Sequence, residues 1–123
     1  MWKFVIRENE QEEIDYILKT DSGRVILHSR NYASDNACRK GIASVTRNSR
    51  TKNFEDCTVK KSGKFIKHPK YEIYGESEGE FKFRLKASNG QVVGTSSGYS
   101  TKEACLADIE ELRKHGSSAI VDY

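Results

Sequence analysis

Short stretches of alternating apolar and polar residues are the main pattern in the sequence. From Phe81 to Lys86 apolar and polar side chains alternate, and from Ile14 to Lys19 they do so except at Ile17, which is the period of a strand with one buried face. Farther along each half, apolar residues recur at helical spacing. The pattern predicts three strands, a helix and one more strand in each half. The clearest of these strands are residues 2–7, 14–19, 24–30 and 54–60 in the first half, and 81–86, 91–97 and 118–121 in the second.

The two halves of the chain resemble each other. When the sequence is shifted by 67 positions, residues 4–48 align with residues 71–115 without a gap, and 11 of the 45 pairs are identical. Such self-similarity indicates one structural unit used twice. A unit of about 45 residues is too small for a confident core of its own, so we expect a shared core. We predict a single domain over residues 1–123, with repeat one at 2–60, a basic connector at 61–69 and repeat two at 70–123.

The two predicted helices carry matching apolar faces. The three cysteines are odd in number and form no CxxC pair, and two of them occupy the same aligned position. We expect these two to be small core hydrophobes rather than disulfide or metal partners. The prediction is an α+β fold, with one mainly antiparallel sheet built from two tandem β3-α-β repeats and two helices packed on one face. The expected core is Cys38, Ile42, Val45, Cys105, Ile109 and Leu112 from the helices, with Tyr16, Leu18, Phe81, Phe83 and Leu85 from the strands.

Local signals refine the turns and helix ends. Asn89-Gly90, between two predicted strands, favours a type I′ hairpin, which requires positive φ at both residues. The run from Ser100 to Glu103 has the form of a capping box, with Ser100 as the N-cap of the second helix. Ser34 or Asp35 caps the first helix, and Gly116 stands where a C-cap glycine belongs.

Charge is distributed unevenly along the chain. Residues 39–70 contain ten Lys or Arg and two acidic residues, a net charge of +8, whereas the whole chain is +3 and the remainder is therefore −5. No apolar run approaches the roughly 20 residues that a membrane span needs. The apolar run at the start of the sequence is too short, and is interrupted too soon by charged residues, to be a signal peptide. We therefore expect a cytoplasmic protein that does not contact a membrane.

No catalytic or metal-binding pattern stands out. The three histidines, His28, His68 and His115, lie on separate predicted elements, and Ser62-Gly63-Lys64 lacks the frame of a phosphate-binding loop. We therefore expect a protein that is not an enzyme and that uses no cofactor or metal.

Two kinds of macromolecular partner fit the remaining features, and another protein is the first hypothesis. Nucleic acid is the alternative, because lysines in the connector and basic residues on one face of strand 81–86 could follow a phosphate backbone. No aromatic residue shares that face, so a base-stacking platform is missing. We expect a monomer in which two repeats replace a dimer, or a homodimer. The candidate partner-binding residues are Lys60, Lys61, Lys64, Phe65, Lys67, Lys82, Arg84 and Lys86.

Three stretches resemble the YegP family, small bacterial proteins built on a repeated domain of unknown function. They are Phe81 to Gly90, Gly98 to Lys102 and, in the first half, the helix ending Gly41 to Asn48. The resemblance covers both halves. It implies that the two units pair edge to edge into one sheet and exchange their last strands. It implies no accepted activity and no site residues.

Overall fold

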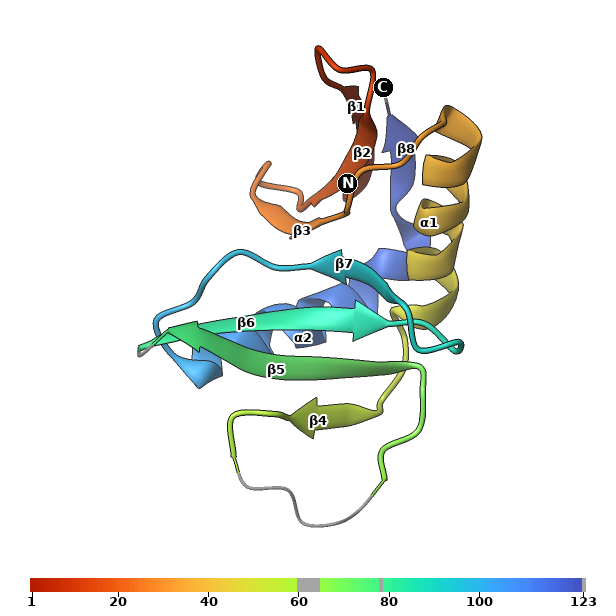
Figure 1. Cartoon of the computed structure of the whole chain (residues 1–123). Helices are drawn as coiled ribbons and strands as arrows, with labels where there is room; N and C mark the ends of the chain where they lie inside the picture. Colours follow the sequence, from red (N-terminus) through yellow and green to blue (C-terminus); the bar gives the residue numbers. More distant parts are fainter. Residues whose placement is uncertain (60–64, 78, 123) are drawn as a thin grey trace.

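The computed structural model describes residues 1–59, 65–77 and 79–122 and contains eight strands, two α-helices and a short 3-10 helix (Figure 1). In chain order they are β1 (Lys3–Glu8), β2 (Ile14–Lys19), β3 (Val25–His28), α1 (Asp35–Asn48), β4 (Phe54–Asp56), β5 (Lys70–Ser77), β6 (Glu80–Lys86), β7 (Val92–Thr95), α2 (Lys102–His115), η1 (Gly116–Ser118) and β8 (Ile120–Asp122). The predicted α+β class is confirmed. The strands predicted at 54–60 and 118–121 are shorter than expected, since β4 ends at Asp56 and η1 takes the start of the last one.

All eight strands form one mainly antiparallel sheet in the order β4-β5-β6-β7-β3-β2-β1-β8. The two outermost pairs are parallel and join the halves of the chain. In one, β4 of the first half pairs with β5 of the second, with Phe54 opposite Tyr71. In the other, β8 pairs with β1, with Ile120 opposite Lys3. Each half therefore contributes its last strand to the outer edge of the other half's strands.

The centre of the sheet is its narrowest junction. Strands β3 and β7 pair antiparallel through a single registered pair, His28 opposite Thr95. By contrast, β1 pairs with β2 along all six of its residues. Packing below the sheet must therefore supply much of the cohesion between the two four-stranded groups.

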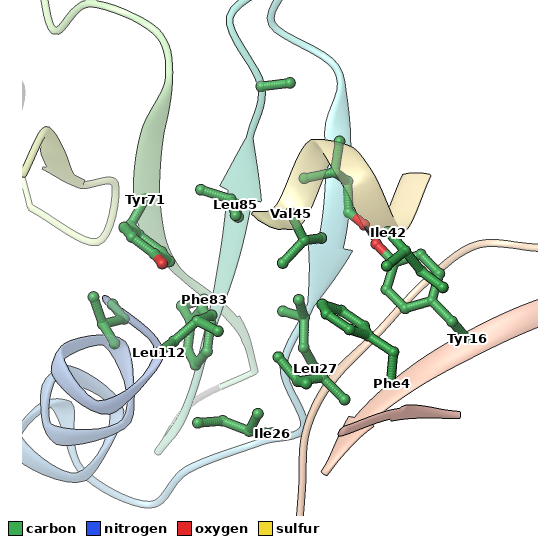
Figure 2. Packing of buried hydrophobic residues seen from close by; sticks show 14 of the residues in the cluster. Phe4, Tyr16, Ile26, Leu27, Ile42, Val45, Tyr71, Phe83, Leu85 and Leu112 are labelled. Carbon is green, nitrogen blue, oxygen red and sulfur yellow. Dashed lines mark hydrogen bonds between the residues drawn. The ribbon is translucent and has the colours of Figure 1, made fainter. Parts of the chain in front are cut away.

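That packing is one hydrophobic cluster drawn from both helices and both groups of strands (Figure 2). The six predicted helix positions are all buried in it, and so are Tyr16, Leu18, Phe83 and Leu85. Phe81 is partly buried and packs against it. Four further residues that were not predicted as core are also fully or almost fully buried: Phe4, Ile26, Leu27 and Tyr71. Aromatic pairs recur in both halves, with Tyr16 stacked on Tyr32 and Phe83 on Tyr99 at centroid distances of 6.3 and 6.2 Å.

Two local predictions are wrong in detail. The turn after β6 is not type I′, because Gly90 has a φ of +83° whereas Asn89 does not adopt positive φ. A register shift at Leu85/Lys86 accompanies this turn, so a bulge supplies the twist that two left-handed residues would otherwise give. The N-cap of α2 is Thr101 rather than Ser100, and its hydroxyl accepts a hydrogen bond from the Ala104 N–H at 3.1 Å. Ser34 caps α1 in the same way, and Gly116 follows α2 as predicted.

Candidate interaction surfaces

The predicted basic row lies on β6, on the face opposite the core. Phe83 and Leu85 are fully buried, whereas the alternating Lys82, Arg84 and Lys86 are half-buried on the other side. Two of these three cations contact the same carboxylate. Arg84 Nε lies 2.6 Å from Glu72 Oε1, and Lys86 Nζ lies 3.2 Å from the same atom.

Glu72 is the centre of an ion-pair network across β4, β5 and β6. Its side chain is 5% exposed, and Lys70 Nζ lies 3.1 Å from Glu72 Oε2 and 2.5 Å from Glu55 Oε1. Burial would raise the pKa of Glu72, but hydrogen bonds from Arg84, Lys70 and Lys86 outweigh it and lower the pKa to about 2. Two cations of the predicted row and Lys70 therefore share one carboxylate, which balances part of their positive charge within the protein.

The described part of the connector has no regular structure and leads into β5 at Lys70. Phe65 is 79% exposed, so this aromatic side chain is neither in a strand nor packed down on the core. Lys67 is exposed, and its carbonyl accepts a hydrogen bond from Asn53 Nδ2 at 3.1 Å. The candidate residues Lys60, Lys61 and Lys64 lie outside the described residues.

Three potential metal ligands meet beside this network. Ligand atoms of Glu55, Cys57 and Glu72 lie within 4.8 Å of one another. The Lys70 ammonium already bridges the two carboxylates. Partial desolvation and the charges of Glu72 and Glu55 also raise the pKa of the Cys57 thiol, which disfavours the thiolate that a metal would require. The geometry is that of an ion-pair cluster in which the Lys70 ammonium stands where a metal ion would otherwise bind.

The outer strand β8 presents a different kind of surface, which was not predicted from the sequence. Ile120 and Val121 are 48% and 41% exposed. Figure 1 shows β8 running beside α1. Val121 and the neighbouring face of α1 line a groove of about 380 Å³. Its lining on α1 consists of Arg39, Ile42, Ala43, Thr46 and Arg47. The two apolar residues near the end of the chain were the available signal, but their exposure depends on β8 being an edge strand.

These features describe a small mixed α+β protein with charged and apolar surfaces on one sheet. Comparison with known proteins identifies its family. The family model described as a domain of unknown function, DUF1508, matches residues 3–56 and 76–122. The UPF0339 protein YegP of Escherichia coli K12 is 30% identical over 118 residues, covering 96% of this chain and 93% of that protein. The chain belongs to this YegP-like DUF1508 family.

A shorter relative and two solved structures agree with that placement. A UPF0339 protein of Treponema denticola is 44% identical over 52 residues, which are 42% of this chain and 90% of the relative. The solution NMR structure of yegP from E. coli, described as a protein of unknown function, matches with a TM-score of 0.76 at 30% identity, covering 98% of this chain and 90% of the other. That of UPF0339 protein SO3888 from Shewanella oneidensis gives 0.75 at 25%, with the same coverage. Among the described helices, none is long and apolar enough to cross a membrane.

Proposed function

We propose that the protein is a non-enzymatic, cytoplasmic interaction module that binds an extended segment of another protein along β8. The observation that carries the proposal is the combination of an apolar edge strand with an adjoining groove. Strand addition to an exposed sheet edge gives affinity through backbone hydrogen bonds and specificity through side-chain pockets. Both requirements have a counterpart here.

The backbone of β8 supports this mode of binding. The N–H of Ile120 donates to the carbonyl of Trp2 at 3.1 Å, on the β1 side. Because successive residues of a strand direct their backbone groups to opposite sides, the N–H and C=O of Val121 point toward the open edge. An added strand would pair there and place side chains in the groove beside Ile42 and Ala43.

The opposite edge of the sheet is less suited to a partner. Strand β4 carries Glu55 and Asp56, which pair with Lys70 and Lys102 at 2.5 and 2.9 Å. Charged residues are a common means of blocking edge strands. The β8 edge is the more apolar of the two, which favours it as the docking edge.

The positive charge in the lining of the groove favours an acidic partner segment. Within the described part of the chain, no carboxylate pairs with Arg47. We therefore expect an extended peptide with an apolar residue for the groove and an acidic residue near it.

Site-specific photo-crosslinking tests the proposal. A photoreactive residue at Ala43, which lines the groove, is compared with one at exposed Ala107 on α2, in cells producing the full chain. The expected result is a discrete protein adduct from position 43 that Val121→Pro abolishes, because proline removes the outward N–H. Leu106→Lys, at another exposed apolar residue, is the control and should leave the adduct intact. Equal adducts from both positions, or none, would contradict the proposal.

Nucleic acid is the second candidate partner. The exposed Lys67 and the net charge of +3 favour it, whereas the ion pairs of Arg84 and Lys86 with Glu72 reduce the charge available to phosphates. Heparin and DNA columns at two salt concentrations separate the candidates. Lack of retention at about 50 mM salt would contradict the nucleic-acid hypothesis, since contacts with phosphates are strongest at low salt.

We also infer that the two halves are tandem copies of one β3-α-β unit that exchange their last strands, so that a monomer resembles a dimer. The family model matches the two halves as separate segments, and the Treponema relative is only about one unit long. A sedimentation measurement at two protein concentrations tests the monomer.

A further inference from the structure

A cavity of about 330 Å³ lies between α1 and the β6–β7 hairpin. Its lining is rich in donors and cations, including Arg30, Lys40, Arg47, Tyr32, Asn89 and Gln91. No acidic side chain is among the described residues that line it. It lies apart from the Glu72 network, and it shares only Arg47 with the groove beside β8.

The three cations of this cavity are not neutralised internally. Across the described residues, no carboxylate forms an ion pair with Arg30, Lys40 or Arg47. Arg30 instead lies over the ring of Tyr32, with its guanidinium carbon 4.8 Å from the ring centroid. Three positive charges around one concave surface attract anions.

The matching position in the second half shows what such a place can hold. There Asp108 of α2 accepts hydrogen bonds from Arg24 Nη1 and Nη2 at 2.6 and 2.9 Å. The Tyr99 hydroxyl donates to the same carboxylate at 2.5 Å. A carboxylate thus joins the helix to the β2–β3 hairpin.

The residues that align with Asp108, Tyr99 and Arg24 at a shift of 67 positions provide no such carboxylate. Gly41 corresponds to Asp108, Tyr32 to Tyr99 and Gln91 to Arg24. Gly41 lies against the Tyr32 ring, where even a Cβ would collide with the hydroxyl. The Tyr32 hydroxyl thus occupies the space next to Gly41 that a side chain would need. The cavity lies beyond it, and its donors face a space without an anion among the described lining residues.

We propose that this cavity binds a small oxyanion, the carboxylate or phosphate group of a small molecule, which joins α1 to the β6–β7 hairpin as Asp108 joins α2 to the β2–β3 hairpin. Its oxygens accept hydrogen bonds from the Tyr32 hydroxyl and the Gln91 amide. Lys40 and Arg47 supply charge from α1, and Arg30 supplies it from the chain after β3. Charge-assisted contacts of this kind are the stronger class of hydrogen bond.

Amide chemical shifts of the full chain, measured by NMR during titration, test the site. The probes are inorganic phosphate and succinate at constant ionic strength, with chloride as the reference anion. We expect saturable shifts centred on Gly41, Ser44, Gln91 and Val93. If only phosphate binds, the ligand class is a phosphate, and if only succinate binds, it is a carboxylate.

Two sets of variants make the test specific. Lys40→Gln combined with Arg47→Gln should weaken binding by about tenfold or more. Tyr32→Phe should weaken it without changing any charge. The matched control, Lys52→Gln combined with Lys114→Gln, removes two exposed lysines that do not line the cavity and should keep the affinity within about twofold. Equal weakening by the two double variants, or shifts spread over all basic surfaces, would overturn the proposal. Val121→Pro should leave anion binding unchanged, so this result is independent of the β8 hypothesis.

Discussion

Leu27 and Gly94, which align when the sequence is shifted by 67 positions, pack against each other at the centre of the sheet. Leu27 is fully buried, and a Cβ placed on Gly94 would lie 2.5 Å from Leu27 Cδ2 and 2.6 Å from its Cγ. At the junction between β3 and β7, the Leu27 side chain thus fills the space that the absence of a side chain on Gly94 leaves open. Identical leucines at both positions would overfill it.

This asymmetry predicts the cost of filling the space. Gly94→Ala should lower the free energy of unfolding by about 1 to 3 kcal/mol, because the new methyl group displaces a core side chain. Leu27→Ala should lower it by about 2 to 5 kcal/mol through the cavity it leaves. The double variant should cost less than the sum by about 1 kcal/mol or more, since each change relieves the other. Urea denaturation of the four proteins measures this coupling, and strict additivity would contradict the packing argument.

Glu72 predicts a distinct dependence of stability on pH. Its folded pKa of about 2 lies below the ordinary 4.5, so its stabilising effect is complete above the ordinary pKa and is lost as the pH falls from about 5 toward 2. Glu72→Gln should cost roughly 2 to 4 kcal/mol at pH 7, because Arg84 and Lys86 lose their shared carboxylate and Lys70 keeps only its ion pair with Glu55. Its stability should then fall less steeply with acid than that of the original protein.

The control for this experiment is Glu103→Gln on the exposed first turn of α2. It should follow the acid dependence of the original protein. If Glu72→Gln and the original protein lost stability in parallel between pH 5 and pH 2, Glu72 would not have the lowered pKa.

Features repeated along the chain were predictable from the sequence. The alternation in β2 and β6 and the paired cysteines on the helices each follow from local periodicity, and they led to the correct elements and most of the core. The pairing of β8 with β1 was expected from the family resemblance and not from spacing. Periodicity cannot specify it, because which strand ends at a sheet edge depends on contacts between distant segments.

The candidate surfaces were less predictable for the same reason. Arg84 was identified as basic and outward-facing, but its partner Glu72 lies opposite it on β5, and cross-strand register decides the pair. The cavity beside Gly41 depends on a hairpin about 50 positions away in the chain. Whether Ser100 or Thr101 is the N-cap depends on the residue at which α2 begins. Helix propensity does not determine that start to within one residue.

That cap gives a simple stability test. Thr101→Ala should lower the free energy of unfolding by about 1 kcal/mol, because the Ala104 N–H loses its acceptor. Ser100→Ala should have an effect within about 0.5 kcal/mol, as expected for an exposed residue outside the cap. Thermal or urea unfolding of both variants decides between the two capping residues. A larger loss of stability for Ser100→Ala than for Thr101→Ala would indicate that Ser100 is the N-cap.

The three cysteines should differ sharply in reactivity. Cys57 is exposed, whereas Cys38 and Cys105 are buried, and burial raises their pKa to about 11 and about 12. A thiol reagent at pH 8 should label one thiol rapidly in the folded protein and three in denaturant, because the thiolate is the reactive form. Cys57→Ser should remove the rapid labelling. More than one rapidly labelled thiol in the folded state would contradict the buried placement.

The two tyrosines at aligned positions should contribute unequally to stability, and this comparison tests the asymmetry between the halves directly. Tyr99 donates to the buried Asp108, whereas Tyr32 faces the cavity. Tyr99→Phe should cost about 1 to 2 kcal/mol because a charge-assisted hydrogen bond is lost, and Tyr32→Phe should cost less than about 0.5 kcal/mol.

The acid dependence of these two variants separates the hydroxyl's role from ring packing, which both substitutions preserve. Burial opposes ionisation of Asp108, but hydrogen bonds from Arg24 and Tyr99 outweigh it and lower its pKa. The resulting stabilisation is present above the ordinary pKa of an aspartate and declines as the pH falls below it. Tyr99→Phe should make that decline shallower, and Tyr32→Phe should leave it unchanged. Identical acid profiles for the two variants would mean that the halves are electrostatically equivalent, which would contradict the presence of a carboxylate in one half where the other has a cavity.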